Sequence, residues 1–133
     1  MKLNVTAIVE RTSDGMYSCS VKENLGNYGI AGYGSTADEA KEDMLTCYNE
    51  MRELNAEEGI ETPELQITYK YDVQSFFNAF PYFKISLIAE ESGMNPSLLR
   101  RYACGKAQAS EAQYGRLRGT LHNIQDKLSV ATF

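Results

Sequence analysis

Hydrophobic and polar residues alternate along the first part of the chain in a way typical of half-buried β-strands. Apolar side chains take every second position over Leu3–Val9, and they do so again over Tyr17–Val21. Between these stretches, Ser13-Asp14-Gly15 has the composition of a tight turn. The pattern therefore predicts a β-hairpin, followed by a loop over Asn24–Gly29 and a third strand over Ile30–Gly34.

The period then changes to that of a helix. Thr36 and Glu39, three residues apart, have the spacing of a capping box at a helix start. Apolar residues follow every three or four positions, at Ala37, Ala40, Met44, Cys47, Tyr48, Met51 and Leu54. Gly59 and Pro63 end this helix, and alternation returns over Leu65–Tyr71, which predicts a fourth strand.

Beyond Asp72 the hydrophobic period is helical throughout. Helices are predicted over Val73–Phe80, Lys84–Ser92, Pro96–Ala103 and about Ser110–Leu128. The sequence therefore predicts an α+β protein of two units. Residues 1–72 would form a β-β-β-α-β sheet-and-helix unit, and residues 73–133 would form an all-α unit.

Charge divides the chain at the same place. The net charge of −5 combines 6 basic and 14 acidic residues through Asp72 with 7 basic and 4 acidic residues from Val73 onward. An acidic first part and a basic second part predict two partners of opposite character, with a polyanion as partner of the second. No apolar run approaches the roughly 18 residues of a membrane span, so we expect a soluble cytoplasmic protein without a membrane partner.

The stretch Ile85–Lys106 carries the local signals of two short helices joined by a tight turn. Gly93 can take the positive φ that such a turn needs. Asn95 is a favoured N-cap, and Pro96 fits the first position of a helix. Gly105 then ends the second helix.

This stretch resembles the helix-turn-helix of the Cro/repressor (XRE) type, and the resemblance covers about Val73 to Leu128. In that family the helix after the turn lies in the major groove of double-stranded DNA. The resemblance implies DNA contacts by Asn95, Pro96, Ser97, Arg100, Arg101 and Lys106. Arg101 would face base edges, where a guanidinium pairs with guanine O6 and N7, and Lys106 would meet phosphate.

Two alternatives apply to the same residues. Adjacent arginines such as Arg100 and Arg101 also occur on ordinary solvated helix faces. A helix-turn-helix can in addition serve protein contacts alone, as a pure protein-interaction module. The combination of Gly93, Asn95-Pro96 and Gly105 with the charge division favours DNA binding over both.

The first part, about Met1 to Asp72, resembles the HicB antitoxin fold, a partial RNase H-like unit. The hairpin, the short third strand, the helix entry Gly32–Ala40 and the closing strand carry this resemblance. It implies binding of a small basic HicA-like toxin, an mRNA nuclease, and repression of the protein's own operon. The same entry is also ordinary helix-start chemistry, so a stand-alone regulator without a toxin is the alternative. Its first part would serve oligomerisation or the sensing of a ligand or partner.

The sequence predicts neither an enzyme nor a bound cofactor or metal. Asp14 and Asp38 have structural roles in a turn and a helix start, and His122 is the single histidine. Cys19, Cys47 and Cys104 have the spacing of neither a zinc site nor a disulfide framework, and we expect all three to be buried.

A homodimer or a higher homo-oligomer is predicted, because a repressor of this type normally reads two half-sites. Two regions are candidates for its surface. One is an aromatic cluster around the junction of the two units, which could also form the seam between them: Tyr71, Phe76, Phe77, Phe80, Tyr82 and Phe83. The other is the long last helix, with Leu117, Leu121, Ile124 and Leu128.

Overall fold

The computed structural model describes residues 2–23, 25 and 29–133. These residues form an α+β structure with a four-stranded mixed sheet and five helices, which confirms the predicted class. The chain divides into two compact units, Met1–Ala79 and Phe80–Phe133. Most of the loop expected over Asn24–Gly29 lies outside the described residues. No helix in the described part of the chain has the length and apolar character needed to span a membrane.

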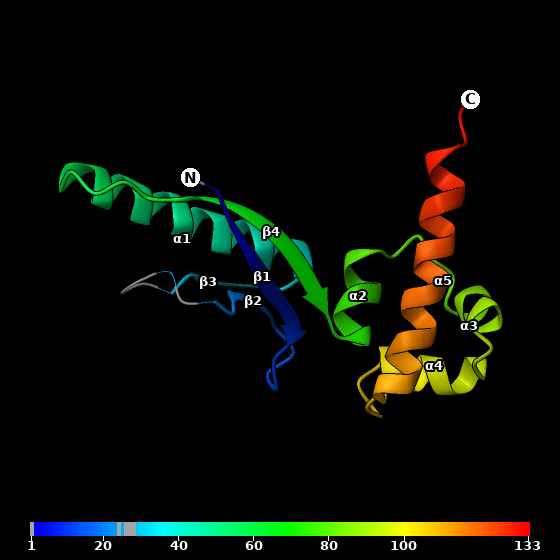
Figure 1. Cartoon of the computed structure of the whole chain (residues 1–133). Helices are drawn as coiled ribbons and strands as arrows, with labels where there is room; N and C mark the ends of the chain where they lie inside the picture. The colour runs from blue at the N-terminus through cyan, green and yellow to red at the C-terminus, as the bar shows by residue number, and fades with distance from the viewer. Residues whose placement is uncertain (1, 24, 26–28) are drawn as a thin grey trace. The chain divides into compact units, whose positions relative to one another are not determined.

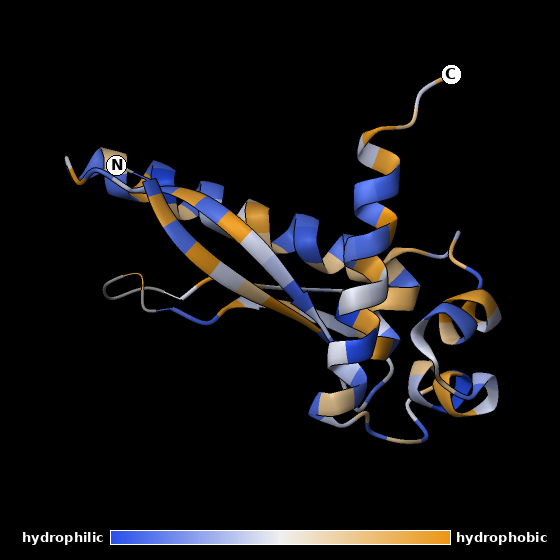
Figure 2. Cartoon of the chain, turned by 45° about the vertical axis from the view of Figure 1, so that its right-hand side comes forward, coloured by the Kyte–Doolittle hydropathy of each residue, from blue (hydrophilic) through white to orange (hydrophobic). Residues whose placement is uncertain are grey.

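The sheet of the first unit contains β1 (Lys2–Arg11), β2 (Tyr17–Val21), β3 (Ala31–Gly34) and β4 (Glu64–Tyr71), as Figure 1 shows. Their order across the sheet is β3-β2-β1-β4. β2 runs antiparallel to both β1 and β3, whereas β4 runs parallel to β1. Figure 2 shows bands of opposite hydropathy alternating along β1 and β4, as expected of strands with one buried and one solvated face.

Helix α1 (Ala37–Glu57) packs on one face of this sheet. Thr36 is its N-cap and accepts a hydrogen bond from the Glu39 N–H at 3.1 Å, as the capping box predicts. The Glu39 carboxylate accepts in return from the N–H of Ser35 at 2.8 Å, one residue earlier than in the standard box. The core between helix and sheet contains Ala7, Val9, Tyr17, Cys19, Ile30, Ala37, Ala40, Met44 and Tyr48.

Gly32 sets how closely α1 approaches β3. A Cβ atom at this position would lie 2.2 Å from the backbone nitrogen of Met44 and 2.4 Å from the carbonyl oxygen of Ala40. These are backbone atoms of α1, so they cannot move aside as a flexible side chain would. The helix therefore rests directly on the strand, and this contact requires glycine.

Helix α2 (Val73–Ala79) belongs to the first unit, although the sequence assigned it to the second. Asp72 caps its start by accepting from the Ser75 N–H at 2.7 Å. The Asn78 side chain accepts a hydrogen bond from the Ala37 N–H at 2.8 Å and so ties α2 to the start of α1. Val73 is buried as well. The division of the chain therefore falls after Ala79 instead of after Asp72.

The second unit contains α3 (Ile85–Ser92), α4 (Pro96–Ala103) and α5 (Glu111–Ser129). Its buried hydrophobic residues are Ile88, Ala89, Met94, Leu99, Tyr102 and Leu117. Ala89 and Leu99 have no exposed surface, and the small Ala89 side chain allows the helices to pack closely.

Aromatic ring contacts occur within each unit. In the first unit, the rings of Tyr71 and Phe76 pack edge to face with centroids 5.9 Å apart. In the second, Tyr82 and Phe83 have centroids 5.3 Å apart. The aromatic residues around the junction therefore contribute to the packing of both units.

Candidate nucleic-acid interface

The turn between α3 and α4 has a single defined geometry. Gly93 adopts φ 68°, the left-handed conformation that ends α3. The Met94 N–H donates to the carbonyl of Ala89 at 2.8 Å, which closes the turn. Arg116 of α5 donates from Nη1 to the Gly93 carbonyl at 3.0 Å. Backbone hydrogen bonds and a contact from α5 thus fix the angle at which α4 leaves the turn.

Helix α5 also holds α3 directly. The hydroxyls of Ser92 and Thr120 are 2.8 Å apart and share a hydrogen bond in a part-buried position. Leu117 of α5 is buried in the core of the unit. Helix α3 therefore packs against both α4 and α5, and α4 has one buried and one solvated side.

Asn95 and Pro96 build the start of α4. The Asn95 side-chain oxygen accepts from the N–H groups of Ser97 and Leu98 at 2.9 and 3.3 Å. Pro96 occupies the first turn, where the missing N–H costs no hydrogen bond. Because its oxygen is occupied by this cap, Asn95 has only its amide NH₂ group free to contact a ligand.

Ser97, Arg100 and Arg101 form the exposed side of α4, which we call the α4 stripe. They are three and four residues apart and so lie on one side of the helix. Leu99 and Tyr102 are buried on the opposite side. Among the residues that the structure describes, no carboxylate forms an ion pair with either arginine of the stripe.

Lys106 lies just beyond the end of α4. Gly105 takes φ 76° there, and the Lys106 N–H donates to the carbonyl of Arg101 at 2.9 Å. The Lys106 side chain is exposed. From Asn95 to Ser110 the sequence carries three basic residues and no acidic one, so the surface formed by α4 and the turn after it is positively charged.

The two arginines also have a structural role. They lie in the last turn of α4, where a positive charge interacts favourably with the partial negative charge of the helix end. This effect is worth about 0.3–1 kcal/mol for an exposed side chain. It accounts for a cation near the end of the helix, but it does not require a second one on the same exposed side.

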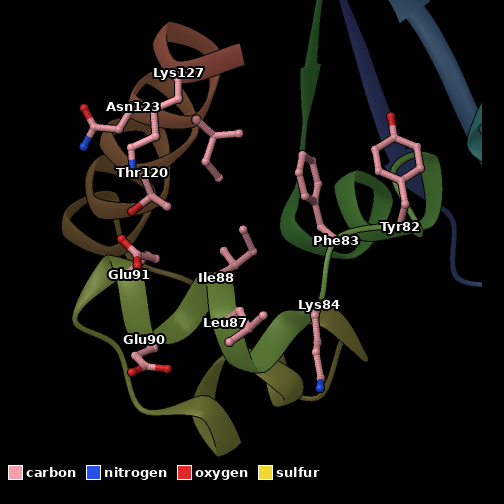
Figure 3. Close-up of a pocket in the computed structure, with 11 residues that line it drawn as sticks. Tyr82, Phe83, Lys84, Leu87, Ile88, Glu90, Glu91, Thr120, Asn123 and Lys127 are labelled. Atoms are coloured by element: carbon pink, nitrogen blue, oxygen red, sulfur yellow. The ribbon is translucent and has the colours of Figure 1, made fainter. Parts of the chain in front are cut away.

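The charges of α3 lie around a different feature of this unit. A cavity of about 640 Å³ opens between α3 and α5, and Figure 3 shows Ile88 and Thr120 among its lining residues. Glu90 and Glu91 line it together with Lys84 and Lys127, and all four are exposed. None of the residues of the α4 stripe lines this cavity. The acidic residues of α3 are therefore associated with the cavity between α3 and α5.

The first unit presents a strongly acidic surface on α1. Seven exposed acidic residues lie along this helix, at Asp38, Glu39, Glu42, Asp43, Glu50, Glu53 and Glu57. The same helix has only two basic residues, Lys41 and Arg52, and Lys41 is half-buried. Half of the 14 acidic residues of the first unit therefore lie on an outward-facing helix surface.

No pattern in the sequence indicated a role for Lys41. Its ammonium group lies 4.4 Å from the ring centroid of Tyr69 and 3.0 Å from the hydroxyl of Tyr71. Burial lowers the pKa of Lys41, but Tyr71 and the Asp38 carboxylate raise it, and the net shift is upward. Lys41 is thus a charged residue that links α1 to β4 through a cation–π contact.

The cysteines differ in their surroundings. Cys19 is buried as expected, and burial raises the pKa of its thiol to about 11. Cys47 is half-buried, whereas Cys104 is exposed, so the prediction of burial is wrong for Cys104. The reason is that α4 ends at Cys104 on the solvated side of the unit. Within the described part of the chain, no group of His, Cys, Asp and Glu side chains is arranged to hold a metal ion.

Comparisons of the chain with protein-family models, with curated proteins and with solved structures found no match. Three local features of the structure therefore bear on the function. They are the α4 stripe with Lys106, the fixed turn before α4, and the acidic surface of α1.

Proposed function

We propose that the chain is a HicB-like antitoxin and a DNA-binding transcriptional repressor that acts in the cytoplasm. The second unit would bind operator DNA as a helix-turn-helix, with α4 as the helix in the major groove. The α4 stripe is the single observation that carries this proposal, because it presents two arginines on one exposed helix side without a carboxylate partner among the described residues.

The residues have different roles in this proposal. Arg101 contacts a base edge, since a guanidinium can pair with guanine O6 and N7. Ser97 and Arg100 contact neighbouring bases or phosphates, and Lys106 contacts phosphate. Asn95 and Pro96 mainly fix the start of α4, and the Asn95 amide is free to donate to the DNA.

The first unit would bind a small basic protein, a HicA-type mRNA nuclease toxin. The acidic surface of α1 supports this proposal, because opposite charges speed association and favour the correct orientation of two proteins. Binding would cover the toxin and block its activity. The complex, or the antitoxin alone, would then repress its own operon.

A stand-alone regulator without a toxin is the second candidate. Its first unit would serve oligomerisation or the sensing of a ligand or partner. A gene for a small basic protein next to this one would favour the antitoxin, and the absence of such a gene would favour the stand-alone regulator.

The test of DNA binding is a salt-titrated binding assay of the full chain with a DNA fragment from its own promoter. The wild type should bind tightly in the presence of competitor DNA and weaken steeply with salt. Arg100→Ala/Arg101→Ala should lose this binding. Arg118→Ala/Lys127→Ala removes the same charge from exposed positions on α5 and should keep most of it.

Three outcomes of this assay have different meanings. Equal loss in both double variants would mean that only total charge matters, which contradicts a specific role for α4. No binding at low salt, even in the presence of the neighbouring gene product, would favour a pure protein-interaction module. Binding that needs that product would favour the antitoxin.

A further inference from the structure

The two edges of the sheet differ in how they are protected. At one edge, β3 is only four residues long, and the Tyr33 N–H donates to the Asp43 carboxylate of α1 at 2.9 Å. At the other edge, β4 has eight residues and contains neither glycine nor proline. Among the described strands, its one paired neighbour is β1. The backbone groups along the outer side of a long edge strand without glycine or proline are suited to pairing with a further strand.

The register shows which backbone groups of β4 point outward. Val9 is aligned with Tyr71, and the Val9 carbonyl accepts from the Asp72 N–H at 3.4 Å. Because the direction of these groups alternates along a strand, the even-numbered residues of β4 direct theirs toward β1. The N–H and C=O groups of Leu65, Ile67 and Tyr69 therefore point to the open edge.

Apolar side chains lie along this edge. Leu65, Ile67 and Tyr69 pack against the core but are only half-buried. Leu45 of α1 is 38% exposed. It follows Lys41 by four residues and therefore lies on the same side of the helix, near β4. A strand added at the open edge would cover part of this apolar surface.

We propose that β4 pairs with β4 of a second copy of this chain, antiparallel and about a two-fold axis at Ile67. This register places Glu64 opposite the partner's Lys70, and the symmetry repeats the pair. It also places Gln66 opposite the partner's Thr68 and Leu65 opposite the partner's Tyr69. The strand is thus complementary to itself in charge, polarity and apolar surface.

Hydrogen-bond geometry agrees with this register. The outward groups of Leu65, Ile67 and Tyr69 would form the hydrogen-bonded pairs across the axis. Glu64 and Lys70 would then stand in non-hydrogen-bonded pairs, where opposite Cα atoms are only about 4.5 Å apart and side chains interact most closely. A slip of two residues would place Lys70 opposite the partner's Gln66 and remove both ion pairs.

The pairing joins the sheets of two copies into one continuous sheet. It supplies the homodimer of the proposed function but does not depend on DNA binding, because it uses the first unit only. A different protein that adds a strand to β4 is the competing occupant, and the following experiment distinguishes it from a second copy.

The test uses two single charge reversals of the full chain, Glu64→Lys and Lys70→Glu, without DNA. Each variant alone places like charges opposite each other at both pairs, so its self-association should weaken at least tenfold. An equal mixture of the two variants restores opposite charges at every pair and should recover the wild-type mass. Sedimentation velocity over a concentration series measures this directly.

Two further variants serve as controls. Ile67→Pro removes an outward N–H that β1 does not use, so it should prevent pairing while the circular dichroism spectrum keeps its form. Glu57→Lys makes the same charge change as Glu64→Lys on the exposed side of α1 and should leave self-association unchanged. A wild type that is monomeric throughout, or single variants that associate like the wild type, would overturn the proposal. Failure of the mixture to recover the wild-type mass would overturn it as well.

Discussion

Arg101 lies on the exposed side of α4, and within the described chain it has no carboxylate partner. Under the proposed function, its guanidinium contacts a base edge. Arg101→Ala should therefore weaken operator binding by roughly 1–3 kcal/mol and relax the preference at one base position. Binding to a set of operator variants measures both effects. Lys127→Ala is the matched control, and an Arg101→Ala variant with unchanged affinity and preference would remove this residue from the interface.

Cysteine reactivity tests the surroundings of single residues without reference to function. Cys104 is exposed, whereas Cys19 is buried and burial raises the pKa of its thiol to about 11. Because the thiolate is the reactive form, an alkylating reagent near pH 8 should modify Cys104 first and Cys19 only after unfolding. Peptide mass spectrometry after timed labelling identifies the modified cysteines. Early modification of Cys19 in the folded protein would contradict the packing of α1 on the sheet.

At the scale of elements, variants of Asn95 at the start of α4 distinguish a structural role of this residue from a role in DNA binding. The Asn95 side chain caps this helix, so Asn95→Ala should lower the free energy of unfolding of the second unit by about 0.5–2 kcal/mol. Asn95→Ser keeps a capping oxygen and should keep most of the stability. Urea unfolding measures the difference.

DNA binding by the same two variants completes the test. If Asn95 acts only as a cap, Asn95→Ser should bind the operator like the wild type. A stable Asn95→Ser variant with altered base preference would show that the amide contacts DNA directly.

The contact between α1 and β3 gives a prediction for the first unit. A Cβ at position 32 would meet backbone atoms of Met44 and Ala40, so Gly32→Ala should destabilise the protein by about 3 kcal/mol or more. Gly29→Ala is the control, because a Cβ there meets nothing within 4 Å. Its effect should stay within about 0.5 kcal/mol. Equal stabilities of the two variants in urea unfolding would contradict the close approach of α1 to β3.

The sequence predicted the elements best where the signal is local. Hydrophobic alternation indicated β1 and β4, and Thr36 caps α1 as its spacing with Glu39 predicts. Gly93 takes the positive φ that a tight turn requires. Each of these features depends on residues within a few positions of one another.

Features that depend on residues distant in the sequence cannot be predicted from local patterns. The parallel pairing of β4 with β1 depends on which strands meet after folding. The same is true of the hydrogen bond from the Ala37 N–H to Asn78, which places α2 in the first unit. At the candidate interface, the sequence selected the exposed arginines and indicated Asn95 as the N-cap, but it did not predict that Arg116 of α5 donates to the Gly93 carbonyl in the turn before α4.

At the scale of the whole molecule, the division of charge coincides with the division into units. The seven basic and four acidic residues counted from Val73 onward all lie after Ala79, so the second unit has a net charge of +3. The first unit carries the excess of acidic residues. Under the proposed function, the second unit would bind a polyanion and the first unit a basic protein.

The claim that α4 reads DNA can be tested by a footprint of the full chain on the DNA upstream of its own gene. We predict two protected half-sites related by two-fold symmetry, with centres separated by one turn of about 10–10.5 base pairs or a multiple of it. Arg100→Ala/Arg101→Ala should abolish the protection, and Arg118→Ala/Lys127→Ala should retain it. Absence of protection by the folded wild type, with and without the neighbouring gene product, would contradict the claim.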